Sequence, residues 1–309
     1  MSPETRICPE SAVRNLAREA GACACAIIRA AEVDVKARES YNRWLTDGLN
    51  GTMAYCEQYE DVRNDPRLLL HGCKWLIICA FNYNPGPLPH SALHIARYAL
   101  GRDYHTVLPE MMRRMTERLT QEYGGETLIA VDTKPLRERY WAQRSGLGWI
   151  GKNNQLIVPG IGSYVFIATA LYTGDIAVTA PPSPEGDICG DCDACIRACP
   201  AHALTADAPA DCRKCLSYLT IEHKGDIPDS IDTHRWLYGC DVCQTVCPHN
   251  RTAPVTEIEQ FRPRSELLAL TADDLLSHSG RSWQRFLGDS AMRRVPLKKL
   301  LSTLRHIHS

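Results

Sequence analysis

The order of hydrophobic and polar positions over the first 175 residues predicts a domain built from both helices and strands. Apolar residues at helical spacing predict helices over 11–20, 37–48, 106–123 and, beginning at Pro135, 135–145. Continuous apolar runs predict buried strands over 23–28, 74–83, 126–132 and 162–173. Because helices and strands alternate along the chain, the pattern indicates an α/β or α+β fold.

The character of the sequence changes after this region. Residues 177–187, AVTAPPSPEGD, have the composition of a linker, and a cysteine-rich segment follows them to about residue 250. The last part of the chain has helical, basic character, with seven Lys or Arg and one Asp over 281–309. We therefore expect three parts, at 1–180, 181–255 and 256–309.

Composition bears on the partners and the cellular location of the protein. The chain has 309 residues, 44% of them hydrophobic, and a net charge of −1, which neither favours nor excludes a nucleic-acid partner. We find no signal peptide and no apolar run of about 18 residues, so a cytoplasmic protein without membrane spans is expected.

Fifteen cysteines are unusual for a reducing compartment, where a dense cysteine pattern indicates metal binding or catalysis rather than disulfides. Six of them are scattered over the first 80 residues. Those in apolar segments, Cys23, Cys25 and Cys79, are expected to be small buried core residues.

The other nine cysteines form the strongest signal in the sequence. The stretch CGDCDACIRACP at 189–200 has the bacterial ferredoxin spacing C-x2-C-x2-C-x3-C-P, and CDVCQTVCP at 240–248 repeats its ending. A tight loop supplies three thiolates to a 4Fe–4S cube and the fourth comes from elsewhere. One cube is expected to take Cys189, Cys192, Cys195 and Cys247. The second is expected to take Cys199, Cys240, Cys243 and either Cys212 or Cys215. Structural zinc on paired C-x2-C knuckles is the alternative.

A glycine-rich stretch, GLGWIGKN at 146–153, resembles nucleotide-binding motifs only superficially. The dinucleotide motif follows a strand and opens a helix, whereas here a helical segment precedes it and the strand-like QLIV follows. A phosphate-binding loop needs a hydroxyl where the chain has Asn153. The glycines therefore indicate backbone that passes close to a ligand or to a neighbouring strand.

Several motifs together resemble the epoxyqueuosine reductase family. They are the two cysteine runs and, in chain order, ARYALGRDYH at 96–105, VDTKPLRERYWAQRSGLGWIGKN at 131–153, CLSYLTIE at 215–222 and YGCDVCQTVCPHN at 238–250. The resemblance covers nearly the whole chain. It implies a cobalamin-binding α/β (α+β) domain, then a bacterial-ferredoxin-like domain with two 4Fe–4S clusters, then a short helical C-terminal tail.

The resemblance also implies an activity. Family members reduce epoxyqueuosine at the wobble position of tRNA to queuosine, with electrons passing from the clusters to cobalamin. Through the VDTKP motif, Asp132 is the proton donor for the departing epoxide oxygen. That role requires a raised pKa, for which burial against the cofactor is the expected cause. The alternative is that Asp132 caps the helix that begins at Pro135.

The same matching implies the remaining site residues. CLSYLTIE selects Cys215 over Cys212 as the eighth thiolate and makes Ser217 a cobalamin contact. Further cofactor contacts are implied at Leu156, Ile167 and Asp241, with ordinary core packing as the alternative for the two apolar residues. Lys152 is expected to meet the cobalamin tail, tRNA phosphate or solvent.

The implied partners are a tRNA with a queuosine-family anticodon and an external electron donor of the flavodoxin or ferredoxin type, with the protein itself a monomer. The basic stretch 281–309 is a candidate phosphate-facing surface, or a solvated basic helix. Many relatives continue into C-terminal helical repeats, and many have CPWN where this chain has CPHN at 247–250. Two alternative functions stay open: a reductive dehalogenase acting on a small molecule, and a ferredoxin-type electron carrier.

Overall fold

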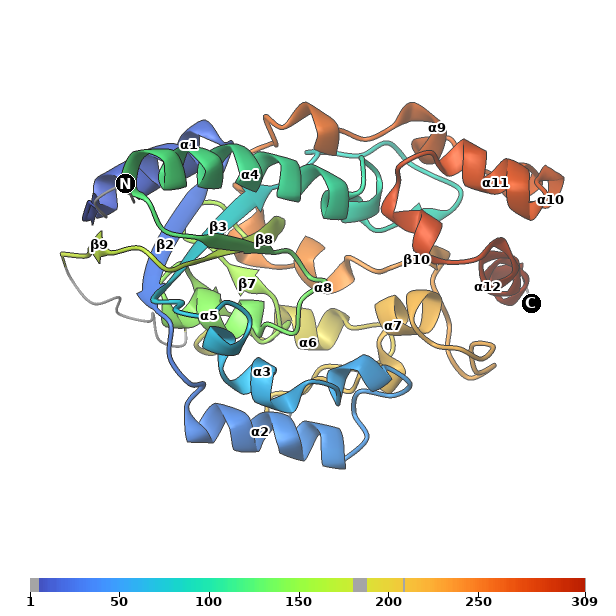
Figure 1. Ribbon diagram of the computed structural model, residues 1–309. Helices are drawn as coiled ribbons and strands as arrows, with labels where there is room; N and C mark the ends of the chain where they lie inside the picture. Colours follow the sequence, from blue (N-terminus) through green and yellow to red (C-terminus); the bar gives the residue numbers. More distant parts are fainter. Residues whose placement is uncertain (1–5, 180–187, 208, 309) are drawn as a thin grey trace.

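The centre of the protein is a four-stranded antiparallel sheet, seen in a computed structural model that describes residues 6–179, 188–207 and 209–308 (Figure 1). The strand order is β2 (Ala24–Arg29), β3 (Trp75–Asn82), β8 (Val165–Tyr172) and β5 (Thr127–Ala130). All four predicted strands are confirmed, with ends shifted by a few residues. Each neighbouring pair in this sheet is antiparallel, so of the two predicted classes the fold is α+β.

Both faces of this sheet are covered, which explains why β3 is a continuous apolar run. Alternate residues of a strand point to opposite faces, and all eight residues of β3 are buried. Ile77 and Phe81 pack on one face with helices α1 (Glu10–Glu19) and α4 (Tyr104–Tyr123). Leu76 and Ile78 pack on the other face with the segment that carries α5 (Glu138–Arg144).

The predicted helices are present, with one boundary wrong. α1 and α4 match 11–20 and 106–123, and α2 (Val35–Thr46) matches 37–48, starting where Asp34 accepts a hydrogen bond from the Ala37 amide. The helix predicted from Pro135 begins only at Glu138. The residues before it form an irregular turn in which Asp132 has a φ of +54°, outside the helical region.

The glycine-rich stretch lies close to a neighbouring strand, which was one of its two predicted roles. It forms a hairpin of β6 (Trp149–Ile150) and β7 (Leu156–Ile157). A Cβ atom on Gly148 would lie 2.1 Å from the Ile157 carbonyl oxygen, so only glycine fits there.

The cysteine-rich segment is built from short elements joined by turns. Its helices and strand are α6 (Ala194–Ala198), α7 (Leu216–Ile221), β10 (Trp236–Tyr238) and α8 (Val242–Thr245). β10 pairs in parallel with β4 (His94–Ile95), which ties this segment to the first half of the chain. Three other short elements lie in the first part of the chain: β1 (Cys8–Pro9), α3 (Glu60–Asn64) and β9 (Ile176–Ala177). Short 3₁₀ helices occur at 54–56, 66–68, 97–99, 212–214, 248–250, 259–261 and 291–294.

Residues 265–308 form a helical layer on one side of the molecule (Figure 1). Its α-helices are α9 (Ser265–Leu268), α10 (Ala272–Ser277), α11 (Gly280–Leu287) and α12 (Leu297–His308). The layer has a core of its own, in which Trp283 and Leu300 pack with Leu93 and Leu237 from earlier in the chain. Among the described residues, no helix is long and apolar enough to cross a membrane. Residues 180–187 of the predicted linker lie outside the described residues, and the division into three domains stays a prediction.

Only one of the three cysteines expected in the core is fully buried. Cys79, on the central strand β3, has no exposed surface. Cys25, on the edge strand β2, is half-buried. Cys23 is exposed, because it precedes the first residue of that edge strand. The prediction is wrong for Cys23.

Candidate active site and iron–sulfur centres

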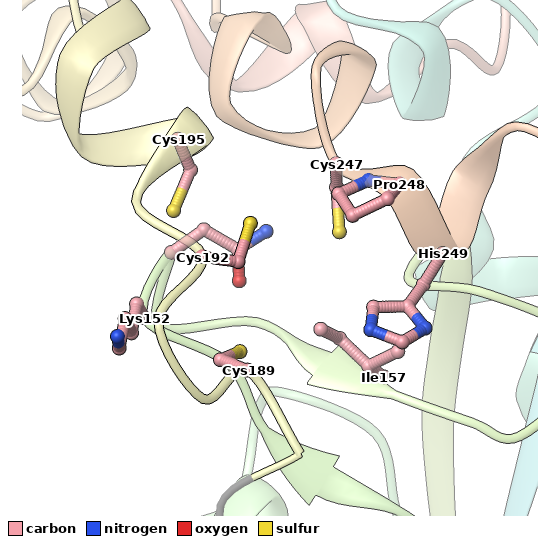
Figure 2. Close-up of a pocket in the computed structure, with 9 residues that line it drawn as sticks. Lys152, Ile157, Cys189, Cys192, Cys195, Cys247, Pro248 and His249 are labelled. Atoms are coloured by element: carbon pink, nitrogen blue, oxygen red, sulfur yellow. The ribbon is translucent and has the colours of Figure 1, made fainter.

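One group of thiols surrounds a small cavity (Figure 2). The tight turn before α6 and α6 itself supply three of them, and the fourth comes from the loop after α8, as the ferredoxin pattern predicts. The four are Cys189, Cys192, Cys195 and Cys247. Their sulfur atoms face a common space, with Ile157 and His249 beside it.

A second group of thiols lies along one wall of a larger cavity and contains Cys199, Cys215, Cys240 and Cys243. Burial raises the pKa of Cys243, and the nearby thiols of Cys240, Cys215 and Cys199 raise it further. Burial likewise raises the pKa of Cys240 to about 12, with Cys215 and Cys199 again among the contributors. These four sulfur atoms therefore lie within electrostatic range of one another. Cys212 also lines the cavity, but it is not among the main neighbours of Cys240 or Cys243.

Both groups have the donor chemistry that a 4Fe–4S cube requires. Thiolate is the form that binds iron, and metal ions offset the electrostatic cost of several buried thiolates placed together. In the described part of the chain, no three His, Cys, Asp or Glu side chains are arranged to hold a single metal ion. In the first group the four sulfur atoms surround a common space, as the ligands of a cube do.

The larger cavity joins the second thiol group to a cluster of polar side chains. Its volume of about 400 Å³ lies within the range of about 300–1,000 Å³ that is usual for small-molecule sites. Its walls include the rings of Tyr83, Tyr98 and Tyr104 and the side chain of Asp132. Asn153 lines both cavities, so the two cavities adjoin each other.

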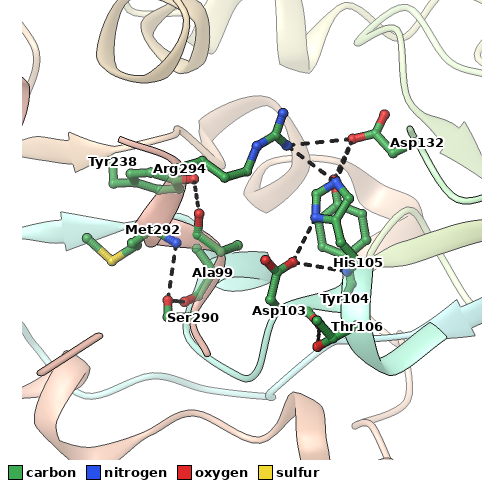
Figure 3. Close-up of polar contacts among 11 residues, drawn as sticks. Ala99, Asp103, Tyr104, His105, Thr106, Asp132, Tyr238, Ser290, Met292 and Arg294 are labelled. Atoms are coloured by element: carbon green, nitrogen blue, oxygen red, sulfur yellow. Dashed lines mark hydrogen bonds and ion pairs between the residues drawn. The ribbon is translucent and has the colours of Figure 1, made fainter. Parts of the chain in front are cut away.

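Asp132 is held in the cavity wall by two hydrogen bonds to the same carboxylate oxygen (Figure 3). The Tyr104 hydroxyl donates to Oδ2 at 2.7 Å, and His105 Nε2 lies 3.3 Å from it. Arg294 Nη1, from the C-terminal layer, is 3.8 Å from the same atom. The backbone amide of Asp132 donates to Glu138 Oε1 at 2.9 Å.

The alternative role of Asp132 as a helix cap is wrong. The residue before α5 is Arg137, which makes no side-chain cap hydrogen bond, and the Asp132 carboxylate is bonded to Tyr104 and His105 instead. Its left-handed backbone conformation costs a non-glycine residue about 1–3 kcal/mol, a form of strain that clusters at functional sites.

The expected raised pKa of Asp132 is also not found. The hydrogen bond with His105, opposed by burial and supplemented by the Tyr104 hydroxyl, lowers the pKa of Asp132 to about 2. His105 shows the opposite behaviour. Burial lowers its pKa, but hydrogen bonds to Asp103 and Asp132 outweigh this and raise it to about 9. Burial, with the Asp132 charge, raises the pKa of Glu138 to about 8.

The remaining predicted residues divide between the cavities and the core. Ser217 and Asp241 line the large cavity, and Asp241 is buried with its carboxylate accepting the Arg97 amide at 2.7 Å. Leu156 and Ile167 pack in the core on one face of the sheet and are not among the lining residues, so their role as cofactor contacts stays a prediction. Lys152 lines the small cavity, where its ammonium donates to the Gly190 carbonyl.

Sequence reasoning missed the residues that surround Asp132. Tyr104 and His105 lie inside the ARYALGRDYH motif, which carried the resemblance but was assigned no role. The alternation of Asp103 and His105 around a tyrosine was the available signal. No sequence signal pointed to Arg294, because it is one of seven basic residues in a stretch that was interpreted as surface.

A mixed α/β chain that brings two groups of four thiols beside a cavity holding a carboxylate has the features of a two-cluster iron–sulfur oxidoreductase. Sequence comparison agrees. A profile described as "4Fe-4S double cluster binding domain" matches residues 188–250, and one described as "Epoxyqueuosine reductase QueG, DUF1730" matches residues 63–133.

Relatives that match almost the whole chain identify its family. The epoxyqueuosine reductase of Gloeobacter violaceus is 38% identical over 92% of this chain and 90% of its own, and that of Leadbetterella byssophila is 37% identical over 93% and 94%. The chain belongs to the epoxyqueuosine reductase family. A crystal structure of epoxyqueuosine reductase with a tRNA-Tyr epoxyqueuosine-modified stem loop superposes with a TM-score of 0.85 at 28% identity, covering 96% of this chain and 81% of that one.

Proposed function

We propose that this chain reduces epoxyqueuosine in tRNA to queuosine, using two 4Fe–4S clusters and a bound cobalamin. The observation that carries the proposal is the large cavity, because it is lined by the second thiol group and by Asp132 at once. Electrons from a cluster on these thiols and a proton from the carboxylate can therefore reach the same bound molecules.

The first cluster is assigned to Cys189, Cys192, Cys195 and Cys247. The second is assigned to Cys199, Cys215, Cys240 and Cys243, with Cys212 left as a neighbour of the site. The cobalamin is assigned to the large cavity, where Ser217 and Asp241 are within its walls and the tyrosine rings offer apolar surface. When bound, cobalamin would supply a low-potential metal centre that takes electrons from the clusters and acts on the epoxide carbon.

The chain's own residues hold and deliver protons in this scheme. Reduction of the epoxide to an alkene takes two electrons and two protons, breaks both carbon–oxygen bonds of the ring and releases water. Asp132 is assigned as the donor to the departing oxygen, because its carboxylate lies in the cavity wall and is half exposed to that space. The hydrogen bonds with Tyr104 and His105 hold the Asp132 carboxylate in one orientation in the cavity wall.

The overall arrangement follows from these assignments. Residues 1–180 form the cobalamin-binding part, 181–255 the ferredoxin-like part, and 256–309 a helical layer that contributes Arg294 to the cavity wall. The seven Lys or Arg residues over 281–309 could contact tRNA phosphates. A related reductase has been solved with a tRNA stem loop. Reducing equivalents are expected from a donor of the flavodoxin or ferredoxin type that reaches the first cluster.

The test is a stoichiometric assay on protein purified without oxygen. Two cubes require about eight iron atoms per chain, with broad absorbance in the 400 nm region. Added cobalamin should bind one to one, and the loaded protein with a chemical reductant should convert epoxyqueuosine in tRNA to queuosine. A protein that holds eight irons but binds no cobalamin would be an electron carrier. A protein that binds cobalamin and reduces an organohalide but leaves the tRNA unchanged would be a small-molecule reductase.

A further inference from the structure

His105 contacts Asp132 beside the Tyr104 hydroxyl, and its ring lies between two carboxylates. Nδ1 lies 2.7 Å from Asp103 Oδ1, and Nε2 lies 3.3 Å from Asp132 Oδ2. Asp103 and His105 belong to the start of α4, where Asp103 also accepts the His105 backbone amide at 3.0 Å. The His105 side chain is only 14% exposed, whereas Asp132 is 51% exposed, so the histidine stands behind the carboxylate as seen from the cavity.

We propose that His105 holds the proton that Asp132 passes to the substrate, and that Asp103 fixes the imidazole ring so that its Nε2–H faces Asp132. The inference deepens the proposed function and rests on it for the identity of the reaction. Asp132 is the group in the cavity wall, but a proton donor must carry a proton. The hydrogen bonds from Tyr104 and His105 stabilise its carboxylate over the carboxylic acid. The proton therefore resides one group further back.

The charges that face His105 are consistent with an imidazolium. From its own helix come Asp103 and the neutral Tyr104, and from the turn after β5 comes Asp132. From α5 comes Glu138, which accepts the Asp132 backbone amide, and from the 3₁₀ turn at 291–294 comes Arg294, whose Nη1 is 3.4 Å from Nε2. The carboxylates of Asp103 and Asp132 and the Arg294 guanidinium leave one negative charge, which a protonated His105 neutralises. Burial and the Asp132 charge raise the pKa of Glu138 to about 8, so Glu138 adds a further negative charge only above that pH. Arg294 opposes that charge and the carboxylates outweigh it, in agreement with the raised pKa of His105.

The proton moves in two steps, from His105 to Asp132 and from Asp132 to the departing oxygen. The Nε2–H bond of His105 breaks as Asp132 Oδ2 takes the proton, and the Asp132 O–H bond breaks as the departing oxygen takes it in turn. Asp132 returns to carboxylate and His105 becomes neutral. Asp103, Asp132, His105 and Arg294 together then carry one net negative charge, which favours uptake of a proton from solvent by His105. That proton is available for the second protonation that water formation requires.

The first test reads the ionisation of His105 directly and does not depend on activity. Protein carrying both clusters and ¹⁵N-labelled histidine is titrated by NMR, and the His105 resonance is the one that His105→Gln removes. We expect it to titrate near pH 9, with both ring nitrogens protonated at pH 7, and to titrate at lower pH in Asp103→Asn. Titration below pH 7 in the unmodified protein, or no change in Asp103→Asn, would overturn the inference.

The second test is the pH profile of single-turnover reduction of epoxyqueuosine in tRNA. The rate should fall as the pH rises through about 9, because His105 then loses its proton. His105→Gln should lower the rate at pH 7 at least about ten-fold and abolish that alkaline limb. Tyr104→Phe is the matched control: it removes the other hydrogen bond to the same oxygen and should keep the limb. An unchanged limb in His105→Gln would refute the role. If the unmodified protein reduces no epoxide, the proposed function fails, and the NMR titration still decides the state of His105.

Discussion

Replacement of Asp132 by asparagine isolates proton delivery from binding. Asparagine retains an oxygen that can accept from Tyr104 and His105, so the turn should keep its place, but an amide carries no proton to deliver. A positioned general acid contributes roughly 10²–10⁴-fold to rate, or about 3–5 kcal/mol. The lost charge weakens two hydrogen bonds, and because the side chain is half exposed the cost to stability should be only about 1 kcal/mol.

The assay compares single-turnover epoxide reduction with iron content, cobalamin binding and thermal midpoint in the same preparations. Asp132→Asn should reduce the rate at least 100-fold and leave the other three properties close to those of the unmodified protein. Asp175→Asn is the matched control, since that carboxylate is 47% exposed and pairs with Lys74 at 2.9 Å outside the cavity lining. A rate for Asp132→Asn within three-fold of the unmodified protein would remove Asp132 from proton delivery.

Two further predictions concern the clusters and the hairpin. Cys215→Ala should lose about four iron atoms per chain and the spectrum of one cluster, whereas Cys212→Ala should retain about eight; the reverse pattern would exchange their assignments. Gly148→Ala should lower stability by about 1–3 kcal/mol, because its Cβ would meet the Ile157 carbonyl oxygen, while Gly280→Ala, with open space around it at the start of α11, should not lower it. Thermal unfolding of both variants provides the measurement, and equal midpoints would contradict the packing argument.

Patterns that act over short stretches of chain were predicted correctly. The buried strands were visible because β3 is covered on both faces and must be apolar throughout. The cysteine spacing was equally informative, since the tight turn around 189–195 fixes three ligand positions locally. One prediction that depended on tertiary packing failed: Cys23 was placed in the core because the position of its segment at the sheet edge was unknown.

The sequence by itself determined that this chain carries two iron–sulfur clusters and which family it resembles, because ligand spacing and motif order are properties of the chain. The tertiary structure decided how the polar end of the cavity is built. His105 and Arg294 are 189 residues apart in sequence and 3.4 Å apart in space. The direction of each pKa shift there follows from that proximity, since an ionisation equilibrium depends on which charges and apolar surfaces the fold brings within a few ångströms.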